Sequence, residues 1–181
     1  MRAQCVAGLA KRRNAASPGY AERWPPRIVQ QQLHDVVADR LCATGKRELP
    51  VHHIAEDFRS IEVRLTLRFF NRNYVGTHFG GSLYAMVDPH LMLLLMQLLG
   101  SGYTVWDKSA RIEFVKPGRG TVRARIVISD EVLAAIRRDT AGGGKVLPEF
   151  VVEILDASGD VVATVKKTLY VRKKAGSGPD R

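Results

Sequence analysis

The sequence has few of the residues that build disulfide frameworks or metal sites. Among 181 residues there are two cysteines, Cys5 and Cys42, which fit a reducing compartment and supply neither a set of disulfides nor a set of metal ligands. A secretory leader is not evident either, because the apolar stretch 5–10 is short and runs into the basic residues 11–13. We therefore expect a cytoplasmic protein without a metal or another cofactor.

A nucleic-acid-binding pattern is also missing, although the net charge is +10. Residues 1–23 carry +4 and residues 166–181 carry +5, which leaves +1 for the middle of the chain. No aromatic residues alternate with these basic residues in a stacking pattern, and no helix-turn-helix is evident. We expect solvated basic ends and no nucleic-acid partner. The chain then divides into a disordered extension (1–25), a single domain (26–174) and a flexible tail (175–181).

What the sequence does have is a series of strand patterns around one apolar helix. Residues 61–69 alternate apolar and polar side chains over nine positions, which is typical of a half-buried strand. Further strands are predicted over 103–115, 121–129, 150–155 and 161–171, a short helical segment over 130–139, and an amphipathic N-terminal helix over 27–43.

The predicted central helix, Leu83 to Leu99, is apolar on every face, since residues 91–96 are consecutively hydrophobic. Such a helix is buried on all sides, either by protein or by lipid. Asp88, Pro89 and His90 in its middle would be costly in a bilayer, so we expect no membrane span. One long helix wrapped by a mainly antiparallel sheet, with an extra N-terminal helix, gives an α+β domain.

Two adjacent residues break local rules inside this helix. Asp88 places a carboxylate in an apolar segment, and Pro89 has no N–H to donate to the carbonyl of Ala85, which costs about 3 kcal/mol in a helix interior. Rule violations that cluster often mark a functional site. Asp88 is therefore either a base or nucleophile in a partly dry cleft, or a carboxylate satisfied at a kink.

A polar amide lies seven residues before a glycine, and a carboxylate lies eight residues after it: Asn73, Gly80 and Asp88. The same two intervals occur in the hotdog-fold acyl-CoA thioesterases of the phenylacetyl-CoA thioesterase type. The chain resembles these enzymes from Phe58 to Lys174. The branch that it resembles is catalogued largely as a domain of unknown function.

The resemblance implies hydrolysis of an acyl-CoA or another acyl thioester. Backbone N–H groups of Gly80, Gly81 or Ser82 would bind the thioester oxygen. Asp88 would attack the carbonyl carbon or activate a water, and Asn73 would orient that water or the carbonyl. The resemblance also implies a homo-oligomer, a dimer or a dimer of dimers, in which Asp88 acts across an interface from Asn73 and Gly80 of the partner chain.

The chain also departs from the pattern of those enzymes. Met92 stands where some of them carry a threonine, one turn after the carboxylate, and Phe79 replaces the histidine before the glycine pair. We expect Met92 and His78 to line the substrate site, although a polar contact within the loop is the favoured explanation of His78 and a catalytic role is not. A hydratase is disfavoured because Asp88 and His90 are two residues apart and point to different sides of a helix. A non-catalytic acyl- or acyl-CoA-binding module remains the principal alternative.

Overall fold

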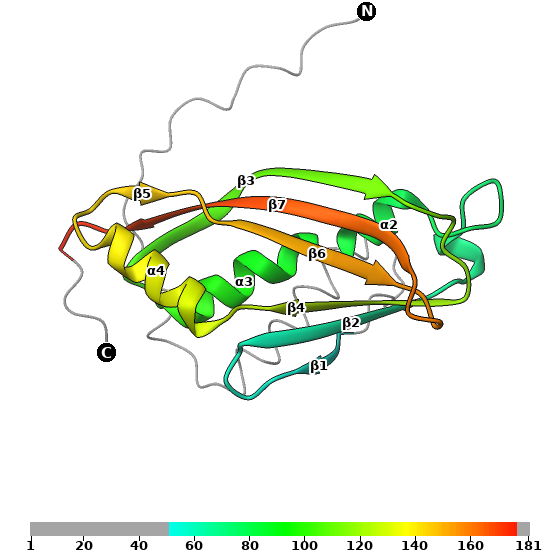
Figure 1. Ribbon diagram of the computed structural model, residues 1–181, viewed down its shortest axis with the longest axis horizontal. Helices are drawn as coiled ribbons and strands as arrows, with labels where there is room; N and C mark the ends of the chain where they lie inside the picture. Colours follow the sequence, from blue (N-terminus) through cyan, green and yellow to red (C-terminus); the bar gives the residue numbers. More distant parts are fainter. Residues whose placement is uncertain (1–50, 177–181) are drawn as a thin grey trace, which may run out of the picture.

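The computed structural model describes residues 51–176 (Figure 1). The predicted N-terminal helix, both cysteines and the whole of the predicted extension (1–25) lie outside these residues. The elements are β1 (Val51–Ile54), β2 (Ser60–Thr66), the 3-10 helix η2 (Phe69–Asn71), α2 (Gly80–Ala85), α3 (Asp88–Leu99), β3 (Tyr103–Phe114), β4 (Thr121–Val127), α4 (Asp130–Thr140), β5 (Lys145–Val146), β6 (Glu149–Leu155) and β7 (Val161–Lys173).

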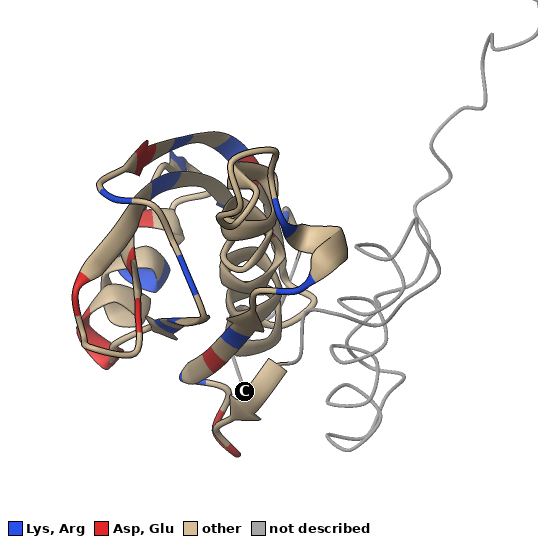
Figure 2. Ribbon diagram, turned by 90° about the vertical axis from the view of Figure 1, so that its right-hand side faces the viewer, with Lys and Arg blue, Asp and Glu red and all other residues tan. Residues whose placement is uncertain are grey.

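The strands form one sheet with the order β1-β2-β4-β6-β7-β3, and the short β5 pairs with β7. Every pairing in the described chain is antiparallel, and the longest joins β3 to β7 over nearly their whole length. The sheet curves around α2 and α3, which lie along its concave face (Figures 1 and 2). The predicted α+β architecture, a helix wrapped by a mainly antiparallel sheet, is confirmed.

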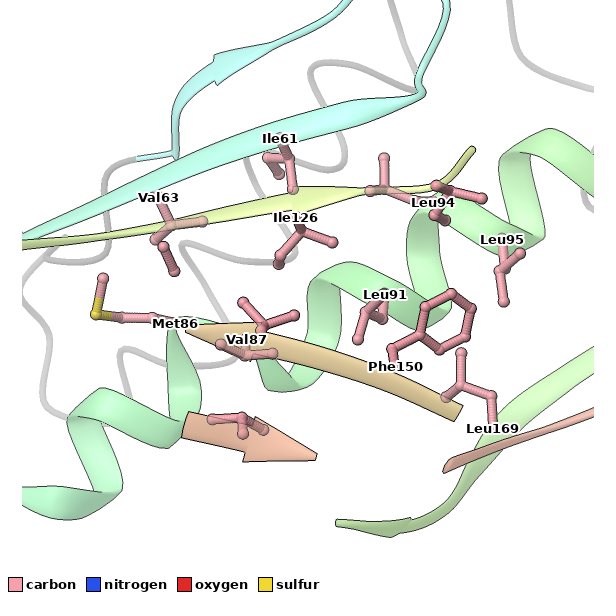
Figure 3. Packing of buried hydrophobic residues seen from close by; sticks show 14 of the residues in the cluster. Ile61, Val63, Met86, Val87, Leu91, Leu94, Leu95, Ile126, Phe150 and Leu169 are labelled. Atoms are coloured by element: carbon pink, nitrogen blue, oxygen red, sulfur yellow. The ribbon is translucent and has the colours of Figure 1, made fainter. Parts of the chain in front are cut away.

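The core lies between the helices and the inward-facing side chains of the sheet (Figure 3). Alternation along each strand supplies one apolar face, as in β4, where Val122, Ala124 and Ile126 are fully buried. Leu91 and Leu94 of α3 meet this face and are also fully buried. Burying one such aliphatic side chain contributes about 1.5–3 kcal/mol, so the sheet is held mainly by this shared layer.

The central helix is not continuous, contrary to the sequence prediction. It divides at Met86 and Val87, whose amides donate to the carbonyls three residues earlier, and α3 then begins at Asp88. Pro89 therefore lies in the first turn of α3, where its missing N–H has no intrahelical partner to lose. The expected penalty for proline in a helix interior does not apply.

One face of α3 is only partly covered by residues 51–176, so the predicted burial on all sides is not seen in the part of the chain that the structure describes. Met96 is 42% exposed, and Met92 and Leu93 on the same side of the helix are only partly buried. The stretch 80–99 is long and apolar enough to cross a membrane, a test that core helices also pass. Here its other face packs on the sheet.

Two strand predictions also need correction. β2 ends at Thr66 rather than Phe69, because the side chain of Asn71 accepts from Arg68 N (2.6 Å) and donates to Thr66 O (2.8 Å), which folds the chain into η2. The second is the expectation of a solvated basic end over residues 166–181, since residues 166–173 belong to β7. Its Lys167 is fully buried.

Candidate active site

Asn73 organises the loop that precedes α2. Its Oδ1 accepts from the backbone amides of Val75 (3.1 Å) and Thr77 (2.9 Å), and its Nδ2 donates to Thr77 Oγ1 (2.8 Å) and His78 O (3.4 Å). Two lone pairs and two N–H groups are the full capacity of a side-chain amide. Asn73 therefore shapes this loop, and its amide has no free group in this arrangement to orient a water.

His78 joins the same loop to the turn between β3 and β4. Its backbone amide donates to Gly118 O (3.0 Å), and its Nε2 lies 3.0 Å from Gly120 O. A carbonyl can only accept, so Nε2 carries the proton and Nδ1 is a bare acceptor without a partner among residues 51–176. Burial lowers the pKa of His78 although the Gly120 carbonyl acts to raise it, so the ring is neutral near pH 7.

The glycine pair at the start of α2 is enclosed by two aromatic rings. A Cβ atom on Gly80 would collide with the ring of Phe114, and a Cβ atom on Gly81 with the ring of Phe79. Neither glycine amide has a hydrogen-bond acceptor among the described residues, whereas the amide of Ser82 donates to Phe79 O (2.9 Å). Of the three predicted amide donors, two are free and Ser82 is already used.

A cavity of about 400 Å³ adjoins Gly80, the first residue of this pair. Three predicted residues line it, Asn73, His78 and Gly80, together with apolar groups that include Leu83 and Phe114. Its volume falls in the range of small-molecule sites, and its lining combines apolar walls with a few polar groups. The cavity can hold an acyl group next to the amide of Gly80.

Asp88 is the first residue of α3, and its carboxylate is held by groups from two other elements. Oδ1 accepts from Tyr84 OH (2.5 Å) of α2 and from Lys167 Nζ (2.7 Å) of β7. Lys167 Nζ also donates to the backbone carbonyl of Asp88 and to Asp107 Oδ1 (2.9 Å) of β3. Oδ2 of Asp88 has no partner among residues 51–176, and the side chain is 38% exposed.

The electrostatic surroundings keep Asp88 ionised. Burial acts to raise the pKa of this carboxyl, but the hydrogen bonds from Lys167 and Tyr84 outweigh burial and hold the pKa below its usual value. Its place in the first turn of α3 favours negative charge as well. Burial and the neighbouring carboxylate raise the pKa of Tyr84, so its hydroxyl remains a hydrogen-bond donor.

Lys167 and Asp107 were missed in the sequence analysis, although the pattern contains them. In β7 the inward positions read Val165, Lys167, Leu169 and Val171, so a lysine occupies a core position of an otherwise apolar face. A charge in such a register must be paired inside the fold. Asp88 was the obvious partner to consider.

The two remaining residues of interest belong to the core. Met92 follows Asp88 by one turn, is partly buried and packs against the core. His90 is fully buried, and burial lowers its pKa to about 4, against the effects of the Met86 carbonyl and Asp88. A neutral buried ring explains His90 without a catalytic role.

The predicted residues thus fall into two clusters within one chain. Asn73, His78 and Gly80 surround the cavity, whereas Asp88 and Met92 do not line it. Asp88 instead joins Tyr84 and Lys167.

Comparison with known proteins decides the family. Residues 44–171 match the family DUF4442, described as a domain of unknown function. The chain belongs to this family. None of the curated proteins compared with the chain matches it.

Solved structures show that this DUF4442 chain has the hotdog fold of thioesterase-like proteins. A probable thioesterase of unknown function from Pseudomonas aeruginosa is similar with a TM-score of 0.70 and 17% identity, over 83% of this chain and 97% of that one. A thioesterase from Haemophilus influenzae gives 0.58 and 16%, over 81% and 94%. A hypothetical thioesterase with coenzyme A from Streptococcus pneumoniae gives 0.55 and 15%, over 80% and 98%.

Proposed function

We propose that the protein hydrolyses acyl thioesters, with an acyl-CoA as the substrate class. The observation that carries the proposal is an ionised Asp88 whose Oδ2 has no partner among residues 51–176, together with the unbonded amides of Gly80 and Gly81, of which Gly80 lines a cavity. A carboxylate and a pair of oxyanion donors are the two parts that thioester hydrolysis requires. The similar structure with coenzyme A supports the substrate class.

In the proposed reaction the acyl group occupies the cavity and its carbonyl oxygen accepts from Gly80 N and Gly81 N. Asp88 removes a proton from a water, the water oxygen bonds to the carbonyl carbon, and the C–S bond breaks. The thiolate takes up the proton, and the products are a carboxylic acid and a thiol. Direct attack by Oδ2, followed by hydrolysis of the resulting anhydride, gives the same products.

We propose that Asp88 and the glycine pair belong to different subunits of a homodimer or of a dimer of dimers. Their separation into two clusters within one chain supports this arrangement. Among residues 51–176, β3 is a 12-residue edge strand on which Trp106 and Phe114 are exposed, and α3 has a partly exposed apolar face. Long edge strands and apolar stripes are the features that subunit pairing covers.

The residues take specific roles in this proposal. Asp88 is the base or nucleophile, Gly80 and Gly81 are the oxyanion donors, and Asn73 acts through the loop that it holds. His78 lines the substrate cavity.

Ser82 and Met92 have lesser roles in the proposal. Ser82 supports the start of α2, and Met92 places an apolar side chain one turn from Asp88.

A non-catalytic acyl-CoA-binding module is the second candidate, and one observation favours it. Met92 offers no hydroxyl to hold a water beside Asp88, whose Oδ1 is already engaged by Lys167. Such a module would bind the acyl group in the cavity without cleaving it.

The deciding experiment offers the full-length protein acyl-CoAs of increasing chain length and measures free-thiol release. We expect turnover with at least one member of the series, and Asp88→Asn should lower kcat about 10²-fold or more. Asp139→Asn, at an exposed position of α4, is the matched control and should leave kcat unchanged. Binding without turnover would establish the module instead, and an active Asp88→Asn would exclude Asp88 as base or nucleophile.

A further inference from the structure

The ammonium group of Lys167 is fully committed to two carboxylate-bearing residues. Its three N–H groups match three acceptors: the backbone carbonyl of Asp88, Asp88 Oδ1 and Asp107 Oδ1. The side chain is 0% exposed, so no N–H group is left for solvent. Lys167 therefore fixes both the main chain and one carboxylate oxygen of Asp88.

We infer that Lys167 is a positioning residue, which holds Asp88 so that Oδ2 faces the thioester or the attacking water. The inference rests on the proposed function and adds to it a residue that never touches the substrate. Tyr84 completes the arrangement, because its hydroxyl donates to the same Oδ1 from α2. With Oδ1 bound twice, rotation of the carboxylate would break two charge-assisted hydrogen bonds.

The surrounding charges make Lys167 the only cation of the cluster. Tyr84 faces it from α2, Asp88 and His90 from α3, and Asp107 from β3. His90 is neutral near pH 7 and Tyr84 remains protonated. One lysine thus serves two carboxylates.

Asp107 and Asp88 therefore compete for the same ammonium group. Asp107 lies where the pairing of β3 with β7 shifts register, which turns its side chain to Lys167. Removing Lys167 leaves Asp88 with a like charge nearby and less support for its ionised form. Removing the charge of Asp107 has the opposite effect, because a negative charge near Asp88 is lost while Lys167 keeps its positive charge.

These two substitutions make a test with opposite expected signs. Lys167→Met keeps an unbranched chain without charge, and we expect kcat/KM to fall about 10²-fold through misplacement of Asp88. The acidic limb of its pH profile should move to higher pH. Asp107→Asn keeps the shape of the site, and its acidic limb should move to lower pH. Lys166→Met, on the exposed face of β7, is the control and should change neither.

A second readout does not depend on activity. The carboxyl carbon of Asp88, assigned by its loss in Asp88→Asn, is titrated by ¹³C NMR in the parent and in the variants. The two variants should move its midpoint in opposite directions, while Lys166→Met leaves it in place.

The outcomes separate the two ideas. Equal midpoints in all variants would overturn the inference whatever the activity, and so would a Lys167→Met protein with parental kcat/KM. If Lys167→Met does not fold, the test depends on Asp107→Asn alone. A lower titration midpoint of Asp88 in that variant would support the inference, and an unchanged midpoint would overturn it. If the parent protein hydrolyses no acyl-CoA, the proposed function is wrong. Midpoints of Asp88 that move in opposite directions in the two variants would still support control of Asp88 by Lys167.

Discussion

The ring of Phe114 lies against Gly80, so closely that a Cβ atom on residue 80 would stand 2.7 Å from Phe114 Cζ. Phe114 is 58% exposed, and the colliding atom is the far end of its side chain, so the ring can move. We expect Gly80→Ala to displace Phe114 and to change the cavity wall, with loss of less than about 1 kcal/mol of stability.

Activity is expected to be more sensitive to this change than stability is. Thiol release should fall about tenfold or more, because the displaced ring alters the approach to the amide at position 80. Gly142→Ala is the control, since no atom lies within 4 Å of the added Cβ. Equal activity in Gly80→Ala and the parent would show that the position of the Phe114 ring does not matter for hydrolysis.

Burial of neutral His90 makes the fold sensitive to acid. The pKa of His90 is about 4 in the folded protein and about 6.5 when unfolded, so between these values the unfolded chain binds more protons. Stability is therefore retained above pH 6.5 and lost as the pH falls, by about 3 kcal/mol for this residue. His78, whose pKa is also lowered, acts in the same direction.

His90→Leu should remove the His90 part of that loss. Urea unfolding at pH 7 and pH 4.5 would give the free energies, and the difference between them should be smaller in the variant. His52→Gln, on the exposed face of β1, should keep the parental difference. An unchanged pH dependence in His90→Leu would mean that other groups cause the acid sensitivity.

Asn73→Ala should loosen the loop before α2, because four hydrogen bonds depend on this amide. We expect a stability loss of about 1–3 kcal/mol and faster hydrogen exchange at the amides of Val75 and Thr77. Tyr74→Ala changes the fully exposed neighbour and should leave both quantities as in the parent. Slow exchange in Asn73→Ala would show that the loop is held by other contacts.

The edge of β3 and the partly exposed apolar face of α3, as seen in residues 51–176, predict self-association. Light scattering at micromolar concentration should give the mass of a dimer or a tetramer rather than the 20.1 kDa of one chain. A stable monomer under these conditions would contradict a site shared between subunits.

Residues 1–23 are predicted to be dispensable for folding, since their sequence lacks periodic apolar residues. A protein that begins at residue 24 should melt within a few degrees of the full chain. A large fall in melting temperature would show that this segment contributes to the folded core.

The strands and their inward faces could be predicted because alternation is local: β4 and β7 follow the pattern of the sequence closely. The bounds of β2 could not, because its end depends on the side chain of Asn71, five residues beyond Thr66. The break between α2 and α3 was missed because the apolar residues continue through it. The single domain over 26–174 and a cytoplasmic location stay predictions.

The candidate site was predictable to the extent that it lies in one stretch. Asp88 was singled out as a carboxylate in an apolar helix, and the resemblance to the thioesterases linked it to the glycine pair, whereas Lys167 lies 79 residues beyond Asp88 and meets it only through the sheet. The contact could not be predicted from the separation in sequence. The inward position of Lys167 in β7 nevertheless indicated that this lysine needs a buried partner.

The contacts of Lys167 also constrain how related sequences can diverge. A change at position 167 alone leaves the carboxylates of Asp88 and Asp107 facing each other, and a loss of both carboxylates leaves a buried cation. Stability is least reduced when positions 88, 107 and 167 change together. Homologues with an apolar residue aligned to Lys167 should therefore also have replaced at least one of the two aspartates.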